Sequence, residues 1–265
     1  MSIIDSLREA WPVGFPVMSA VFGAITGSFL GVVVERVPAM VREEAESDNL
    51  LFPGSHCPVC QHSLSAWENI PLVSWLALRG RCRKCRSAIP LRLFLMELVS
   101  ALGFGLTACF IADAGTLFSL WLLAAFLLPL AMIDWRHQLL PDCLTQPLLW
   151  AGLLLHAVGH TLPLQDALFG AVAGYLSLWL IYWAFRLMTG REGLGYGDFK
   201  LLAALGAWCG WQALPLILFA ASVSGIAGYF LFNKLNKNNQ TISFGPYLAL
   251  AGIGVFVSQL FAFTY

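Results

Sequence analysis

Long apolar runs alternate with short polar segments along most of the chain. Six runs have about 20 mostly apolar residues, the length at which a helix crosses the hydrocarbon core of a bilayer: 12–34, 93–112, 115–133, 144–162, 168–187 and 243–263. A further run, 199–232, is too long for one such helix, and we expect a short helix at 199–211 followed by a longer one at 214–232. The pattern predicts an all-α polytopic membrane protein with about eight transmembrane helices.

One long polar segment, residues 35–90, interrupts this pattern between the first and second predicted spans. The first apolar run is long and no convincing small-residue cleavage site follows it, so we expect a retained helix and not a signal peptide. The chain therefore divides into three parts. These are a first transmembrane helix (1–36), a polar lobe (37–91) and a bundle of the remaining membrane helices (92–265).

The composition agrees with a membrane protein. Of the 265 residues, 58% are hydrophobic and only 11% are charged, a far more apolar balance than that of an ordinary soluble domain. We expect membrane lipid as the main solvent. The formal net charge is zero, which gives no indication of a nucleic-acid partner, and we expect none.

The position of the basic residues predicts the orientation in the membrane, because Lys and Arg accumulate in short cytoplasmic loops. With eight spans and the N-terminus outside, only Arg8 falls on the outer side. The other fourteen of the fifteen basic residues fall on the opposite side, which should be the cytoplasm: Arg36, Arg42, Arg79, Arg81, Arg83, Lys84, Arg86, Arg92, Arg136, Arg186, Arg191, Lys200, Lys234 and Lys237. The polar lobe then lies in the first cytoplasmic loop.

Two C-x-x-C pairs lie in this lobe, Cys57 with Cys60 and Cys82 with Cys85, with twenty-one residues between the pairs. The spacing is typical of a zinc ribbon, in which two tight knuckles close a tetrahedral shell of four thiolates around Zn²⁺. A reducing cytoplasm favours metal thiolates over disulfides. A redox dithiol or a disulfide is the alternative interpretation. Four protein ligands leave no open position for a substrate water, so we expect a structural zinc ion.

Other metal-binding side chains have simpler interpretations. His56 and His62 flank the first knuckle, but four cysteines already satisfy the metal, so we expect surface histidines. Cys109, Cys143 and Cys209 lie in apolar surroundings, where a thiol acts as a small hydrophobic group.

Two aspartates lie near the ends of predicted spans, where ionisable groups are costly and usually functional. Asp134 closes the third span, and Asp198 opens the sixth within Gly195-Tyr-Gly-Asp198. The predicted topology places both at the cytoplasmic boundary. Two carboxylates brought together there do not both ionise easily, so one can activate a water while the other, protonated, polarises a carbonyl group. Alternatively, Asp198 is a helix N-cap and Asp134 is paired with Arg136.

Motifs along nearly the whole chain resemble one family, the prepilin peptidases or type IV leader peptidases, which are G-x-G-D intramembrane aspartyl proteases. Besides the two cysteine pairs, they are Gly27-Ser-Phe-Leu, Glu35-Arg-Val-Pro, Trp67-Glu-Asn-Ile-Pro, Leu78-Arg-Gly-Arg-Cys, Glu97, Asp134 to Leu140-Pro-Asp142, Glu192-Gly-Leu-Gly-Tyr-Gly-Asp-Phe-Lys, and Phe244-Gly-Pro-Tyr-Leu-Ala-Leu. The family usually carries Asn after Gly-Ser-Phe-Leu, where this chain has Gly31.

This resemblance implies a bifunctional enzyme of the bacterial inner membrane with its N-terminus in the periplasm. It would cut the basic leader from type IV prepilins or type II secretion pseudopilins on the cytoplasmic side, and then methylate the new N-terminal amine with S-adenosylmethionine. The resemblance gives Asp134 and Asp198 the catalytic roles, and Asp142 could assist or substitute for Asp134.

The sequence identifies no binding site for the methyl donor, because the lobe contains no glycine-rich strand-to-helix turn. Glu35, Glu68 and Glu97 are candidates for a part in the transferase reaction or in positioning the basic leader, with surface charge as the equal alternative for Glu35 and Glu68.

Two other classes of function compete with this one. A proton-coupled transporter would also use carboxylates in a helical bundle, but it has less need of a four-cysteine lobe and would be expected to show two related halves. A membrane-anchored zinc-ribbon scaffold would explain the cysteines and leave both aspartates without a role. Small residues at four-residue spacing, in Gly23-Gly27-Gly31, Gly170-Gly174 and Gly206-Gly210, predict close helix packing.

Overall fold

The computed structural model describes residues 8, 10–42, 49–159, 162–191, 193, 195–235 and 243–263. Over these residues the fold is all-helical, with two isolated β-bridges in the lobe. The chain forms two compact units, Met1–Ala125 and Phe126–Tyr265, and the division falls inside helix α5. The all-α prediction is confirmed, whereas the three-part division into anchor, lobe and bundle stays a prediction.

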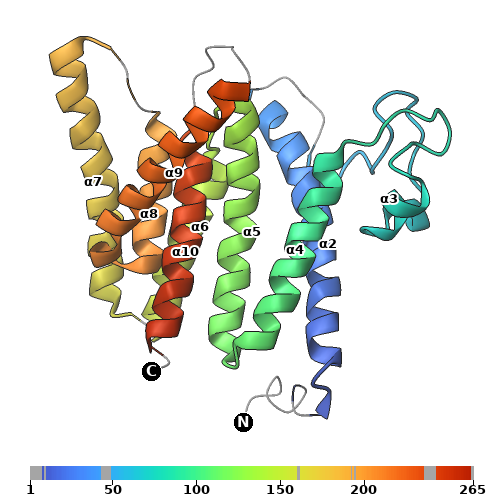
Figure 1. The fold of residues 1–265 in the computed structure, drawn as a ribbon, viewed down its shortest axis with the longest axis horizontal. Helices are drawn as coiled ribbons and strands as arrows, with labels where there is room; N and C mark the ends of the chain where they lie inside the picture. The colour runs from blue at the N-terminus through green and yellow to red at the C-terminus, as the bar shows by residue number, and fades with distance from the viewer. Residues whose placement is uncertain are drawn as a thin grey trace. The chain divides into compact units, whose positions relative to one another are not determined.

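The first unit is built on two long helices that lie side by side (Figure 1). Its elements are α2 (Gly14–Val41), the short 3₁₀ helix η1 (Ala66–Asn69), α3 (Val73–Ala77), α4 (Leu91–Phe110) and the first half of α5 (Ala114–His137). Helices α2 and α4 cross closely, since a Cβ at Gly23 would overlap the Ser100 carbonyl oxygen and one at Gly27 would lie 2.7 Å from that of Met96. The predicted packing role of these glycines is confirmed.

Helix α2 continues to Val41, beyond the predicted end of the first span. Val37 and Pro38 are buried, so its last turns are held by packing although Glu35 and Arg36 interrupt the apolar run. The lobe begins after this helix and returns to the membrane at α4.

In the second unit, other helices pack around one short helix, α8 (Tyr196–Cys209). Its elements are the second half of α5, α6 (Asp142–Ala157), α7 (Leu164–Thr189), α8 (Tyr196–Cys209), the 3₁₀ helix η2 (Trp211–Ala213), α9 (Leu214–Leu235) and α10 (Gly245–Phe263). Helix α8 packs against α6, α7 and α10 (Figure 1), and every residue from Asp198 to Cys209 except Lys200 is buried. At the α7–α8 crossing, a Cβ on Gly206 would overlap the backbone of Gly170. A helix that is apolar all round is expected in such a central position.

Helices lie at all eight predicted positions, and five are long and apolar enough to cross a membrane: α2, α4, α5, α7 and the segment Trp211–Leu231. Helices α6 and α8 have 16 and 14 residues, or about 24 and 21 Å at 1.5 Å per residue, less than the roughly 30 Å of the hydrocarbon core. The described apolar part of α10, Gly245–Leu260, is also shorter than those five. The chain is therefore a multi-pass membrane protein, with its eight-span count still a prediction.

Candidate active site and metal centre

The two cysteine pairs lie in two turns with the same backbone geometry, offset by 25 residues. In the first, the Cys57 N–H donates to the His62 carbonyl (2.9 Å) and the Gln61 N–H donates to the Cys57 carbonyl (2.9 Å). In the second, the equivalent bonds run from Cys82 to Ser87 (2.8 Å) and from Arg86 to Cys82 (3.0 Å). Gln61 and Arg86 share a positive φ, 55° and 61°. The sequence repeat is therefore a structural repeat of two knuckles.

The four thiols converge. Their Sγ atoms all lie within 4.8 Å of one another, with 3.7 Å between Cys57 and Cys85 and 3.9 Å between Cys60 and Cys82. A tetrahedral zinc site with Zn–S bonds of about 2.3 Å has Sγ–Sγ edges of about 3.8 Å. All four are free thiols, so the arrangement matches a metal centre and not a pair of disulfides.

Hydrogen bonding prepares part of this cluster for metal binding. The Ser87 hydroxyl lies 3.5 Å from Cys57 Sγ and 3.1 Å from Cys85 Sγ, and it lowers the pKa of both thiols, that of Cys57 to about 6. For Cys60, the backbone bond from His62 lowers the pKa but is outweighed by desolvation and by the other thiols, which raise it to about 11. A metal ion binds thiolates, so binding would release the remaining protons.

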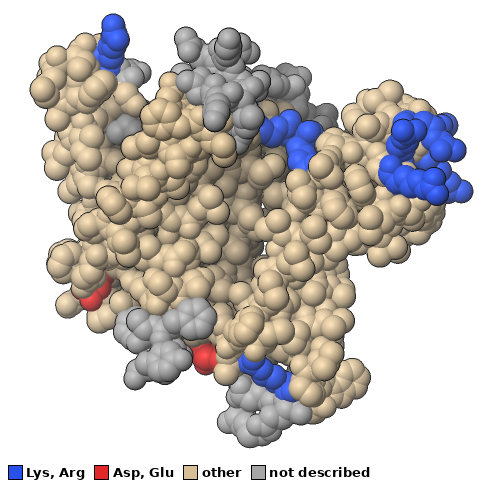
Figure 2. Space-filling model, viewed as in Figure 1, with Lys and Arg blue, Asp and Glu red and all other residues tan. Residues whose placement is uncertain are grey.

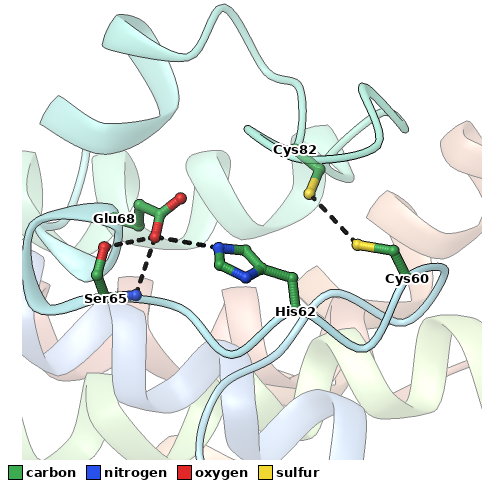
Figure 3. Close-up of polar contacts among 5 residues, drawn as sticks. All are labelled: Cys60, His62, Ser65, Glu68 and Cys82. Carbon is green, nitrogen blue, oxygen red and sulfur yellow. Dashed lines mark hydrogen bonds and ion pairs between the residues drawn. The ribbon is translucent and has the colours of Figure 1, made fainter.

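A buried carboxylate supports the first knuckle (Figure 3). Glu68 is buried, and its Oε2 accepts hydrogen bonds from the Ser65 hydroxyl and from the Ser65 N–H at 2.9 Å. These two bonds hold the pKa of Glu68 below its usual range. His62 Nε2 lies 3.5 Å from the same oxygen. Glu68 is thus not the surface charge that the sequence allowed, and His62 faces Glu68 while the four cysteines form the cluster.

Asp134 lies in the last turn of α5, where it is 6% exposed. Its Oδ2 accepts a hydrogen bond from the Gly245 N–H at 2.9 Å, and its backbone carbonyl accepts one from the Ser243 hydroxyl at 2.8 Å. A Cβ at Gly245 would lie only 2.6 Å from Oδ2. The N-terminus of α10 therefore closes directly onto this carboxylate, a contact that only glycine permits.

Asp198 lies in the first turn of α8 and is 8% exposed. It is close enough to Asp134 for the two side chains to interact electrostatically. Gly195 precedes the helix in an extended conformation, and a Cβ at Gly197 would lie 2.8 Å from the Cβ of Leu140. The second glycine of G-x-G-D thus lets the start of α8 approach the α5–α6 loop, and the two aspartates come together in one unit.

The chemical environment of Asp142 differs from that of Asp134 and Asp198. Its side chain is 61% exposed, and both carboxylate oxygens accept hydrogen bonds from Lys200 Nζ, at 2.6 and 2.8 Å. The ion pair joins the start of α6 to Lys200 of α8, two residues after Asp198. The Asp142–Lys200 contact was not predicted, although both residues lie in motifs of the family.

The remaining candidates have structural partners. Glu35 forms an ion pair with Arg92 at 2.7 Å, and Glu97 accepts the Leu72 N–H at 2.7 Å. Gly31 is buried on α2 against the Leu93 side chain. Of the other cysteines, Cys209 is buried, while Cys109 and Cys143 are exposed.

The contacts of Gly245 and Ser243 with Asp134 were not predicted from the sequence. Both residues lie in or beside the motif Phe244-Gly-Pro-Tyr, which precedes and opens α10. A glycine directly before a proline at a helix start, where the first N–H groups are free, was the available signal for an acceptor at this position.

Fold and site together define a multi-pass helical membrane protein with a four-cysteine lobe and a buried pair of aspartates. The chain belongs to the type IV leader peptidase family: residues 121–231 match the model of that name, and residues 21–111 match the bacterial peptidase A24 N-terminal domain.

Similar proteins extend over nearly the whole chain. A prepilin leader peptidase/N-methyltransferase of Stutzerimonas stutzeri is 46% identical, covering 91% of this chain and 90% of its own length. Proteins of the same name from Pseudomonas aeruginosa (46%; 95% and 93%) and Pectobacterium carotovorum (43%; 94% and 96%) are similar to the same extent. No solved structure matches the chain.

Proposed function

We propose that this chain removes the leader peptide from type IV prepilins or type II secretion pseudopilins, and then N-methylates the new N-terminal residue with S-adenosylmethionine as the methyl donor. The observation that carries the peptidase half is the buried, interacting pair Asp134 and Asp198 in a member of the type IV leader peptidase family. The methyltransferase half rests on the names of the relatives.

The two aspartates divide the chemistry between them. The Gly245 N–H and the positive end of the α10 dipole face Asp134, so Asp134 is the better placed to carry the negative charge and to take a proton from the attacking water. Asp198 holds the shared proton and donates it to the oxygen of the scissile carbonyl. In the next step Asp134 gives the proton that it took from water to the leaving amine, the C–N bond breaks, and Asp198 takes a proton back from a hydroxyl of the tetrahedral intermediate, which restores the pair.

The predicted topology indicates the side of the membrane from which the substrate would reach the two aspartates. With eight spans and the N-terminus in the periplasm, the ends of α5 and α8 that carry the aspartates face the cytoplasm, where a basic leader would be met before its apolar stem. The membrane is then the bacterial inner membrane. The positions of the basic residues support this orientation.

The four cysteines are proposed to hold a structural Zn²⁺ ion. Bound there, the ion would cross-link the two knuckles, and with four thiolate ligands it would have no open position for substrate. Cys57, Cys60, Cys82 and Cys85 are thus assigned to stabilising the lobe. No residues are assigned to binding S-adenosylmethionine.

A transporter and a zinc-ribbon scaffold were the alternatives, and the relatives named above support neither. The test is to incubate the purified chain in detergent with a prepilin and follow the product by mass. We expect loss of the leader without added donor, and a product heavier by one methyl group when S-adenosylmethionine is present. An unchanged prepilin would refute the peptidase, while cleavage without the methyl increment would refute only the transferase.

Replacing Cys57 and Cys82 together by serine should abolish metal binding, since each knuckle loses a thiolate. Bound zinc, measured by elemental analysis, is expected to fall from about one ion per chain to near zero, with loss of lobe stability because metal binding contributes to folding. The matched control is Cys143→Ser, an exposed cysteine outside the cluster, which should keep its zinc. Unchanged zinc in the double variant would show that the ligands are wrong.

A further inference from the structure

The depth of helix α3 relative to the membrane follows from contacts within the first unit. The Glu35–Arg92 ion pair joins α2 to α4 and is partly exposed, with charged residues at the lobe end of both helices. Beyond it, Leu95, Val99 and Leu102 are 45–53% exposed along one face of α4, as expected for a face in contact with lipid. The ion pair is therefore at the level where the helices leave the hydrocarbon core.

Helix α3 packs on the membrane side of that level. Glu97 is five residues after Arg92, or about 7.5 Å farther along α4, and its carboxylate accepts the N–H of Leu72, the residue before α3. Trp75 stacks on Phe94 with 4.6 Å between ring centroids. Interfacial helices bury their apolar face about 5–10 Å into the boundary between headgroups and acyl chains, and these contacts would hold α3 at a comparable depth if α4 spans the membrane.

The outer face of α3 suits this position. Val73 and Leu76, one turn apart, are 59% and 60% exposed. Exposed apolar side chains on a helix of five residues have no favourable contact in water, but at this depth they would contact acyl chains.

Basic residues follow α3 directly. The second knuckle and its approach carry five exposed basic side chains, which we call the basic knuckle: Arg79, Arg81, Arg83, Lys84 and Arg86. Figure 2 shows Lys and Arg side chains gathered on the surface of the lobe. The Arg83 guanidinium lies 5.2 Å from the centre of the Trp67 ring. Within the described part of the chain, the other four have no ion-pair partner.

The chain connection keeps these charges near the membrane surface. Lys84 is seven residues before Leu91, the first residue of α4, so its backbone cannot lie more than about 25 Å from the start of α4 even if the chain were extended. At the other end of the basic knuckle, Arg79 follows the last residue of α3, Ala77, by only two residues. Juxtamembrane clusters of Lys and Arg are attracted to anionic phospholipid headgroups. A basic leader peptide would be repelled by the same cluster.

We propose that α3 and the basic knuckle form an interfacial surface that binds the anionic phospholipids of the leaflet facing the lobe. Val73 and Leu76 enter the boundary with the acyl chains, and the basic side chains contact the phosphates. The neighbouring apolar face favours a membrane over a nucleic acid, which would need only the charges. This inference requires α2 and α4 to span the membrane and is independent of the peptidase activity.

The test measures amide hydrogen exchange of residues 72–90 in the full-length chain, in nanodiscs of phosphatidylcholine alone and in nanodiscs that also contain phosphatidylglycerol. We expect exchange at residues 79–86 to be at least about fivefold slower with the anionic lipid, and the difference to disappear in about 1 M salt, where the screening length is about 3 Å. Inorganic phosphate added to the phosphatidylcholine nanodiscs should give no protection.

Two sets of variants test the basic knuckle and the apolar face of α3 separately. Replacing Arg79, Arg81, Lys84 and Arg86 by Gln should remove the effect of phosphatidylglycerol, while Arg191→Gln, an exposed basic residue of the other unit, should retain it. Val73→Ser with Leu76→Ser should speed exchange in α3 in both kinds of nanodisc. Bound zinc in each variant checks that the lobe is folded. Equal exchange in the two lipids, or protection by an added oligonucleotide in place of the lipid, would overturn the proposal.

Discussion

Asp134→Asn and Asp198→Asn are each expected to lower kcat/KM for leader removal by about a thousandfold or more, in the range of losing a general acid or base. Asn has nearly the volume of Asp, so both buried positions stay filled. An amide in place of the Asp134 carboxylate cannot take a proton from water, and an amide in place of the Asp198 carboxyl group cannot act as the acid. Because each carboxylate acts through the other, either change is expected to stop the reaction. The measurement is the rate of leader removal by purified variants that retain wild-type zinc content.

Asp142→Asn is the matched control for this prediction, because Asp142 lies in the same motif as Asp134 but is exposed and bound to Lys200. Its loss removes a surface ion pair, worth at most about 1 kcal/mol, and leaves the aspartate pair in place. We expect activity within about tenfold of wild type. Full inactivation by Asp142→Asn together with an active Asp134→Asn would transfer the role to Asp142.

Gly245→Ala is expected to lower kcat by about a hundredfold while changing KM little. The new methyl group would lie 2.6 Å from Asp134 Oδ2, so either the carboxylate or the start of α10 must move, and a displacement of about 1 Å at a reacting group costs that much. The residue does not contact the substrate in this account, so binding should be nearly unaffected. Separate values of kcat and KM for leader removal provide the test.

Gly254→Ala on the same helix is the control, since nothing lies within 4 Å of a Cβ at that position and Ala is the better helix former. It should keep wild-type kinetics and stability. If Gly245→Ala were as active as Gly254→Ala, the N-terminus of α10 would have no part in positioning Asp134.

The helices could be predicted from sequence because their signal is local. Each of the eight predicted helices is present at nearly the predicted place, including the break between α8 and α9 at Gly210, where φ is +79°. The number of spans could not be predicted in the same way. Helix α8 has the apolar composition of a span because it is buried on all sides by other helices, and composition alone does not distinguish burial in protein from burial in lipid.

The cysteine cluster was equally predictable, since the two knuckles are short local turns and the spacing of the cysteines identifies the four ligands. The support around Asp134 was not. The Gly245 N–H comes from a residue that is 111 positions away in the chain, and such a contact depends on how α10 packs onto α5. Leu72 and Glu97 illustrate the same limit, because the Glu97 carboxylate was visible in the sequence as a candidate but its backbone partner, the Leu72 N–H, was not.

The most direct measurement of the central claim is a comparison of leader removal by Asp134→Asn, Asp198→Asn and the double variant under single-turnover conditions. If the two carboxylates act as one unit, the first loss already removes the mechanism, so the double variant should react within about threefold of either single variant. A double variant whose loss equals the product of the two single losses would show two independent contributions, and cleavage at the wild-type rate by either single variant would contradict the assignment of the pair.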